Sequence, residues 1–387
     1  MDYRTEVREI ELEFVAGFYK PGKQRSNSFA NGERKLWAAE NREYRRLLDN
    51  QVIHGGAALL CKGEVVAFPT ETVYGLGADA GKKEAVKKIF VAKGRPADNP
   101  LIVHISGREQ LFDIISGEIS QDASRLMNEF WPGPLTLIFP RGKNVPDTVT
   151  AGLDTVAVRM PRHPVARALI TVSGLPLAAP SANSSGFPSP TRAEHVFADL
   201  AGRIPLIIDG GPCPVGVEST VVDLTSERPE ILRPGGISRE EIAEILGQKL
   251  VERQNAERRN LEEEVKTPAA PGMKYRHYSP QTPVWLFGTG DLGAVKQIIA
   301  DNPDKKITFV LTEETTEKAK KLPEVELEIL ASRGDPKTAA HRLFFLLRKL
   351  DSGESDVIAV EAIPRRGLGE AVMNRLHKAA DSDIYLK

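Results

Sequence analysis

Cysteine is scarce in this sequence, and its scarcity removes several kinds of site. Only Cys61 and Cys213 occur among 387 residues, so the chain has no disulfide framework and no Cys-x-x-Cys metal motif. The seven histidines are scattered without a His-x-x-x-His pair, which argues against a zinc site. Cys213 stands in the segment GPCPVG without an accompanying His–Asp pair, so we interpret it as a turn residue rather than as a nucleophile.

A charge excess and a long apolar run are also missing. Lysine and arginine number 52 against 53 acidic residues, a net charge of −1, whereas proteins that coat nucleic acid carry a clear basic excess. Any RNA contact must therefore come from a local patch. No apolar run reaches 18 residues, so we expect no membrane span. The charged opening MDYRTEVREIELEF does not resemble a signal peptide, and we expect a cytoplasmic protein.

The chain is long enough for two domains with separate cores. Residues 1–50 are polar and receive no assignment. Short apolar runs bounded by proline and glycine then alternate with helical patterns over 51–246, which predicts a first α/β domain. The charged and then proline-rich segment 247–282 is interpreted as a linker. A second strand–helix alternation over 283–387 predicts a smaller, doubly wound, Rossmann-like α/β domain.

Two cations stand two residues apart in the stretch AKGRPADNPLIVHI. Arg95 precedes Pro96, and a residue before proline is pushed into an extended conformation. If the run is extended, Lys93 and Arg95 point to the same side, roughly 6–7 Å apart. At that distance they repel by about 2.5 kcal/mol at an effective dielectric near 20. A solvated surface pair remains an alternative, but in a cleft the two side chains require an anion.

Other polar residues follow the same pattern on predicted strand ends and loops. Ser181 and Asn183 are two apart in PSANSSGFPSPT, where hydroxyl and amide groups suit a phosphate or a nucleobase. Arg159 and Arg233 each end a strand-like run shortly before a proline, and strand ends are where α/β folds build ligand sites. With Lys93 and Arg95 they make four cations, a number that suits a triphosphate plus a carboxylate. Each residue alone also fits a structural role.

A glycine pattern raises a different reading. Gly75-x-Gly77-x-x-Ala80 nominally fits a dinucleotide fingerprint, but PTETVY separates it from the preceding strand and Pro69 breaks that strand. A nicotinamide or flavin oxidoreductase therefore stands only as a weak alternative.

Seven motifs in order resemble the YrdC-type L-threonylcarbamoyladenylate synthases. They run from about residue 56 to 246, and the Lys-x-Arg and Ser-x-Asn pairs are hallmarks of that family. The motifs are PTETVYGLGADA, KGRPADNPLIVHI, WPGPLTLIF, VAVRMPRHP, PLAAPSANSSG, GVESTVVDL and ILRPGG. The tail with APGMKYRHYSP is similar to the longer, two-domain branch. The resemblance implies an α/β fold, with a YrdC-like twisted mixed-sheet catalytic domain followed by the smaller domain.

The resemblance also implies the chemistry. Such enzymes condense L-threonine, bicarbonate (as CO2) and ATP, with Mg²⁺, into threonylcarbamoyl-AMP and pyrophosphate. A partner transferase then modifies the adenosine next to the anticodon of certain transfer RNAs, and the synthase itself makes at most a weak contact with transfer RNA. The implied L-threonine contacts are Thr72, His104, Arg159, Ala179 and Ser219. The implied ATP contacts are Lys93, Arg95, Asn99, Thr155, Ser181, Asn183, Ser189, Arg233 and Tyr275, with Lys93 and Arg95 as the catalytic cations. Arg276 and His277 are alternatives to Tyr275 as the linker residue that contacts the nucleotide.

A noncatalytic RNA-binding module is the alternative from another functional class. In it, Lys93, Arg95, Lys274 and Arg276 contact phosphates, and the tyrosines Tyr275 and Tyr278 stack on bases. The near-neutral net charge disfavours this reading.

Overall fold

The computed structural model describes residues 3–12, 42–226, 228–247, 250, 278–322, 325–351 and 353–381. It divides into two compact units, which are described separately. The first takes the described residues of Met1–Ser185, Pro190–Pro214 and Glu218–Lys274, and the second those of Gly186–Ser189, Val215–Val217 and Tyr275–Lys387. None of the described helices is long and apolar enough to cross a membrane.

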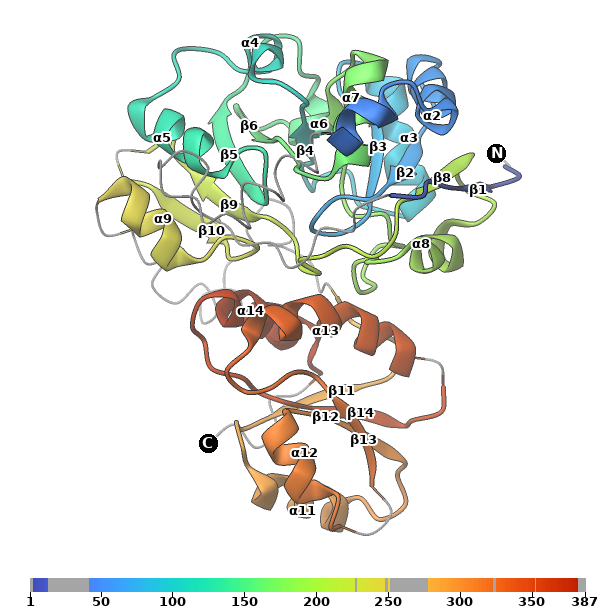
Figure 1. Cartoon of the computed structure of the whole chain (residues 1–387), viewed down its shortest axis with the longest axis vertical. Coiled ribbons are helices and arrows are strands. Elements are labelled where there is room, and N and C mark those ends of the chain that lie inside the picture. The colour runs from blue at the N-terminus through green and yellow to red at the C-terminus, as the bar shows by residue number, and fades with distance from the viewer. Residues whose placement is uncertain are drawn as a thin grey trace. The chain divides into compact units, whose positions relative to one another are not determined.

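The first unit is built on a ten-stranded mixed sheet (Figure 1). Its strand order is β1-β8-β2-β3-β7-β4-β6-β5-β9-β10. The strands are β1 (Glu6–Glu9), β2 (Val66–Phe68), β3 (Gly75–Asp79), β4 (Ile102–His104), β5 (Leu135–Pro140), β6 (Thr155–Arg159), β7 (Leu177–Ala178), β8 (Leu206–Asp209), β9 (Thr220–Asp223) and β10 (Glu230–Arg233). The predicted twisted mixed-sheet class is confirmed. Strand β1 comes from the unassigned amino-terminal residues and pairs in parallel with β8 at the edge of the sheet.

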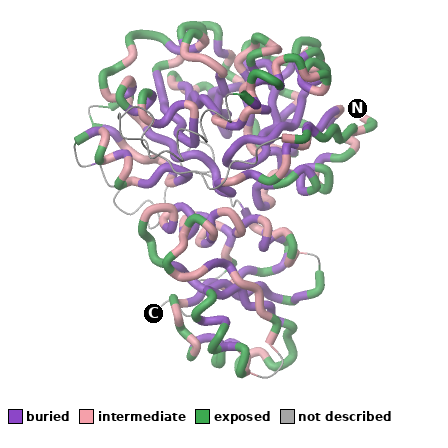
Figure 2. Tube along the Cα trace, in the orientation of Figure 1, coloured by how far each residue is buried: buried purple, intermediate pink, exposed green. Residues whose placement is uncertain are grey.

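Helices cover this sheet. They are α2 (Gln51–Cys61), α3 (Lys83–Lys93), α4 (Leu111–Ile114), α5 (Gln121–Phe130), α6 (Asp147–Thr150), α7 (Pro164–Ser173), α8 (Ala193–Leu200) and α9 (Arg239–Leu246), with the 3-10 turn η1 (Arg108–Gln110). Because side chains alternate along a strand, β2 sends Ala67 into one apolar cluster and Val66 and Phe68 into another. The inner strands are accordingly buried along most of their length, whereas β1 at one edge is exposed and β10 at the other is partly buried (Figure 2).

The second unit is a four-stranded, fully parallel sheet in the order β11-β14-β12-β13. Its strands are β11 (Val284–Phe287), β12 (Ile307–Leu311), β13 (Glu326–Ile329) and β14 (Val357–Glu361). Its helices are α11 (Leu292–Asp301), α12 (Glu313–Ala319), α13 (Pro336–Leu350) and α14 (Leu368–Ala379). Figure 1 shows α11 and α12 on one side of the sheet and α13 and α14 on the other, which is the predicted doubly wound arrangement.

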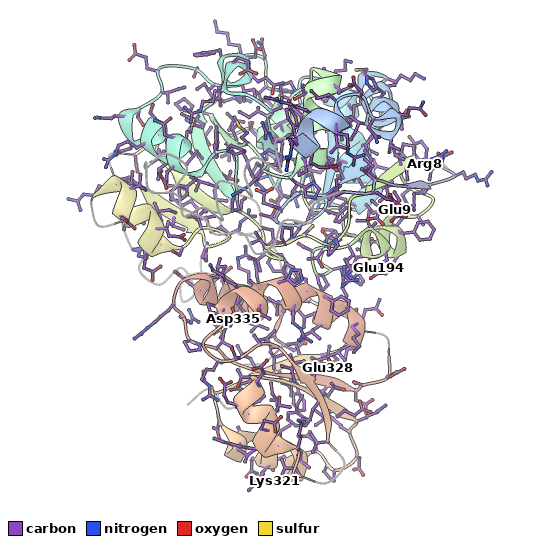
Figure 3. The ribbon with its side chains drawn as sticks, in the orientation of Figure 1. Arg8, Glu9, Glu194, Lys321, Glu328 and Asp335 are labelled. Atoms are coloured by element: carbon purple, nitrogen blue, oxygen red, sulfur yellow. The ribbon has the colours of Figure 1, made fainter. Side chains whose placement is uncertain are left out.

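Helix α13 begins where its sequence supplies a cap. The side chain of Asp335 (Figure 3) accepts hydrogen bonds from the backbone N–H groups of Lys337 and Thr338, and Pro336 occupies the first turn.

The structure of β3 contradicts the hypothesis of a dinucleotide-binding glycine motif. Gly75 and Gly77 lie inside this strand and not in a turn that opens a helix. A Cβ at Gly77 would stand 2.6 Å from Cε1 of the buried Phe68, whereas at Gly75 the nearest atom would be 3.4 Å away. Glycine is needed at Gly77 for close packing within the sheet, and phosphate binding does not explain it.

Candidate active site

Lys93 is brought to a buried position by helix α3. It is the last helical residue and only 3% exposed, and Gly94 follows in the left-handed conformation that ends the helix. The expectation that Lys93 and Arg95 lie on one extended run is therefore wrong, because the helix continues through Lys93 and the chain turns at Gly94. The ammonium group donates to the backbone oxygens of Ser181 (2.6 Å) and Asn183.

The Ser-x-Asn loop is held against β3. Ser181 forms a β-bridge with Gly75, and its hydroxyl donates to Oδ1 of Asn183 at 2.5 Å. The structure thus brings the Ser-x-Asn pair to Lys93, although 88 residues separate Ser181 from that lysine. Lys93 also donates to Oδ1 of Asn183 at 3.4 Å, and these oxygens partly offset the cost of burying an ammonium group.

Asn99 carries a buried amide without a partner. The residue is 1% exposed, and among the described residues neither its Nδ2 nor its Oδ1 has a hydrogen-bond partner. A buried amide group left in this state costs about 1–3 kcal/mol, so it points to a polar ligand. Arg95 lies beside it and donates from Nη2 to the backbone oxygens of Asn99 (3.3 Å) and Pro100 (3.1 Å). Thr155 begins β6, which pairs in parallel with the strand that follows Asn99.

Arg159 is the centre of a second buried group. Its Nη1 donates to Oγ1 of Thr72 at 2.8 Å, and its Nε donates to the backbone oxygen of Gly133 at 3.2 Å. Its Nη2 lies 2.6 Å from Oε1 of Glu71, and both side chains are 4% exposed. Glu71 was not singled out in the sequence, although an acid between two threonines in PTET was a signal that could have identified it.

His104 stands directly beside Arg159, because the parallel register of β4 and β6 pairs these two residues. Burial, followed by the positive charge of Arg159, lowers the pKa of His104 to about 3. The imidazole is therefore neutral near pH 7, and its Nδ1 lies 3.2 Å from the backbone oxygen of Ile102. The buried Ala179 donates its backbone N–H to the same oxygen at 2.9 Å.

Ser219 and Arg233 are joined to this group through Thr136, which lies opposite Arg159 in the antiparallel pair of β5 and β6. The hydroxyls of Thr136 and Ser219 are 2.7 Å apart. Arg233 donates from Nη2 to the backbone oxygen (3.0 Å) and the hydroxyl (3.2 Å) of Ser219. Thr136 was not identified in the sequence, because a threonine inside LTLIF is indistinguishable from an ordinary strand residue.

Two predicted ATP contacts are not part of these groups. Ser189 is 1% exposed and belongs to the segment Gly186–Ser189 of the second unit. Tyr275 lies outside the described residues, as do Lys274 and Arg276.

The position of Tyr278 contradicts the RNA-binding alternative, in which this ring stacks on bases. It is 5% exposed, and its ring stacks on Phe344 at a centroid distance of 5.3 Å. A ring packed in this way offers no free face to a nucleobase.

The buried groups contain no activated thiol. Burial raises the pKa of Cys213 far above its usual value, so the thiol stays protonated. Within the described residues, no three His, Cys, Asp or Glu side chains are grouped so that they could hold a metal ion. The chemistry available here is charge neutralisation and orientation by arginine, lysine, hydroxyl and amide groups.

Comparisons with known proteins decide the family. Residues 58–235 match the Sua5/yciO/yrdC family model, described as telomere recombination, and residues 237–381 match the model described as threonylcarbamoyl-AMP synthase, C-terminal domain. The threonylcarbamoyl-AMP synthase of Bacillus subtilis is 46% identical over 352 residues, 90% of this chain and 99% of the relative. The chain belongs to the Sua5 family of threonylcarbamoyl-AMP synthases. The resemblance found in the sequence, including the two-domain form, is confirmed.

Other members of the Sua5 family support the same conclusion. The threonylcarbamoyl-AMP synthase of Pyrococcus abyssi is 45% identical over 345 residues, which cover 87% of this chain and 96% of the relative. The crystal structure of P. abyssi Sua5 complexed with L-threonine superposes with a TM-score of 0.77 at 47% identity and covers 85% of this chain and 94% of that one. The family is therefore shared over both units and not only over the first.

Proposed function

We propose that this enzyme condenses L-threonine, CO2 from bicarbonate, and ATP into threonylcarbamoyl-AMP and pyrophosphate. The proposal rests on one observation: the short segment 72–75 contacts both the buried group around Arg159 and the buried group around Lys93. Thr72, just before β3, contacts Arg159, and Gly75, at the start of β3, bridges with Ser181 beside Lys93. One segment thus serves an amino-acid subsite and a phosphate subsite.

The group around Arg159 fits L-threonine, the ligand named for the P. abyssi structure. A guanidinium group suits the substrate carboxylate, and the hydroxyls of Thr72 and Ser219 suit its polar atoms. His104 is neutral and adds no second cation beside Arg159. Ala179 leaves room for the threonine methyl group.

Lys93 and Arg95, together with Arg233 from the group around Arg159, are proposed to bind ATP. The three cations supply positive charge for the phosphates, and the unpartnered amide of Asn99 supplies a donor and an acceptor. Thr155, Ser181, Asn183, Ser189 and Tyr275 complete the proposed ATP contacts.

The reaction needs orientation more than covalent catalysis. The threonine amine adds to CO2 and loses a proton, which gives a carbamate. A carbamate oxygen then bonds to the α-phosphorus while the bond to the leaving pyrophosphate breaks. Lys93 and Arg95 are the proposed catalytic cations, because they can stabilise charge that grows on the phosphates as this bond breaks.

Mg²⁺ is expected to arrive with ATP. The described residues supply no cage of acidic ligands, so the triphosphate would hold the ion, and no step above depends on it. We further propose that the product passes to a transferase acting on transfer RNA in the cytoplasm.

The direct test measures pyrophosphate release from purified enzyme with ATP, and omits L-threonine or bicarbonate in turn. We expect release only when all three substrates are present, together with a product of the mass of threonylcarbamoyl-AMP. Release that continues without threonine or without bicarbonate would contradict the proposal.

A further inference from the structure

Glu71 is the one acid in direct contact with Arg159 among the described residues. Its Oε1 lies 2.6 Å from Nη2 of Arg159. Its Oε2 accepts backbone N–H groups from Arg162 (3.0 Å) and His163 (3.4 Å), which lead into helix α7. The carboxylate therefore joins the end of β6 to the residues that lead into α7.

The contact between Glu71 and Arg159 leaves hydrogen-bonding capacity on the guanidinium group. Within the described part of the chain, neither Oε1 of Glu71 nor Nη2 of Arg159 takes part in a well-aligned hydrogen bond, so the short contact is an ion pair only. Nε and Nη1 are directed to Gly133 and Thr72. A guanidinium group has five N–H donors, so a second N–H of Nη1 and the N–H groups of Nη2 are left to receive a ligand carboxylate.

The pair also balances charge. Both side chains are almost fully buried, and a buried cation without a counter-charge is strongly unfavourable. With Glu71 present, the subsite is close to neutral before an amino acid enters. A carboxylate can then bind to Arg159 without the guanidinium first shifting toward another acceptor.

We infer that Glu71 is a positioning residue that fixes the Arg159 guanidinium in the orientation that receives the carboxylate of L-threonine. This inference rests on the proposed function. It assigns to Glu71 no contact with the reacting atoms.

The test compares Glu71→Gln with wild-type enzyme in steady-state assays of pyrophosphate release. Glutamine keeps an acceptor for the backbone of Arg162 and His163 but removes the charge. We expect the KM for L-threonine to rise at least tenfold, with the KM for ATP within twofold of wild type. Glu71→Asp keeps the charge on a shorter side chain and should show a smaller rise. If the glutamine variant does not fold, the KM values of the aspartate variant are compared with those of the wild-type enzyme in the same way.

Binding of L-threoninamide separates positioning from a general structural effect, because this analogue lacks the carboxylate. Calorimetry should show that Glu71→Gln weakens L-threonine binding at least tenfold but changes L-threoninamide binding by less than twofold. The matched control is Glu43→Gln, since Glu43 is also a 3% exposed carboxylate of the first unit paired with an arginine, Arg46. It should leave both affinities unchanged.

Two results would overturn the inference. One is an unchanged KM for L-threonine in both Glu71 variants. The other is an equal loss of binding affinity for threonine, threoninamide and ATP. Failure of the wild-type enzyme to bind threonine would instead contradict the proposed function, so the two failures are distinguishable.

Discussion

At the scale of single residues, the site is defined by polar groups buried where water cannot reach them. Arg159 and Arg233 are 3% and 5% exposed, and each is held by hydroxyl or backbone oxygens from other segments of the first unit. Such networks fix side chains in one orientation, because leaving any member without a partner costs free energy. Arg95 and Asn99 are proposed to contact the phosphates, and the amide of Asn99 has no hydrogen-bond partner among the described residues.

Arg95→Ala is expected to lower threonine- and bicarbonate-dependent pyrophosphate release at least tenfold, or about 1.4 kcal/mol of transition-state stabilisation. The guanidinium group is proposed to neutralise phosphate charge that develops as pyrophosphate leaves. Measurement of kcat and kcat/KM under saturating bicarbonate checks the prediction. Retained activity would show that the group is not at the phosphates.

Asn99→Ala should separate ligand binding from stability. Its amide has no partner in the described structure, so its removal should not lower the midpoint of thermal unfolding and can raise it. The KM for ATP should rise about tenfold, while the KM for L-threonine should stay within twofold. A marked loss of unfolding midpoint would indicate that the amide serves the fold instead.

At the scale of secondary-structure elements, β3 is the strand on which both polar groups depend. It lies between β2 and β7, and the Ser-x-Asn loop lies against its first residue. Gly77 lets this strand pack against Phe68, whose ring is fully buried and cannot move aside.

Gly77→Ala is expected to lower the free energy of unfolding by about 1–3 kcal/mol, because overpacking forces a shift in a close-packed core. Gly75→Ala is the matched control, since its Cβ would meet Phe68 at an ordinary 3.4 Å, and it should cost less than about 1 kcal/mol. Urea unfolding of the two variants checks the difference. Equal stabilities would contradict this account of the strand.

At the scale of the whole molecule, each unit is stabilised by its own buried residues. In the second unit the central buried polar residue is Glu361, which is 0% exposed at the end of β14. Its carboxylate accepts from the backbone N–H groups of Gly290 and Thr312, both at 2.7 Å, and from the hydroxyl of Thr315 at 3.0 Å. Arg333, after β13, lies 3.4 Å away, so all four parallel strands meet at this one side chain.

Glu361→Ala should destabilise the second unit by about 3–5 kcal/mol, because it leaves a partly buried arginine and several backbone groups without their acceptor. Amide hydrogen exchange should show lost protection in β11, β12, β13 and β14. The control is Glu326→Ala, which removes a half-exposed carboxylate from the same sheet and should have little effect. Unchanged exchange in the Glu361 variant would contradict the proposed role.

The sequence by itself determined the family, most of the strands and the residue types of the site, but it did not identify β3, whose glycines nominally fitted a dinucleotide fingerprint. These features are local or carried by motifs: apolar runs bounded by proline and glycine predict strands, and Lys-x-Arg and Ser-x-Asn are visible as spacings. The sequence did not reveal β1, because Glu6–Glu9 is polar and gains strand structure only by pairing with β8.

Only the tertiary structure decided which polar residues meet. The ion pair of Glu71 with Arg159 and the hydroxyl pair of Thr136 with Ser219 join residues that lie far apart in the sequence. Thr136 and Arg159 lie on paired strands, and a single step of register would turn each of these two side chains to the opposite face of the sheet. No spacing along the chain contains that information.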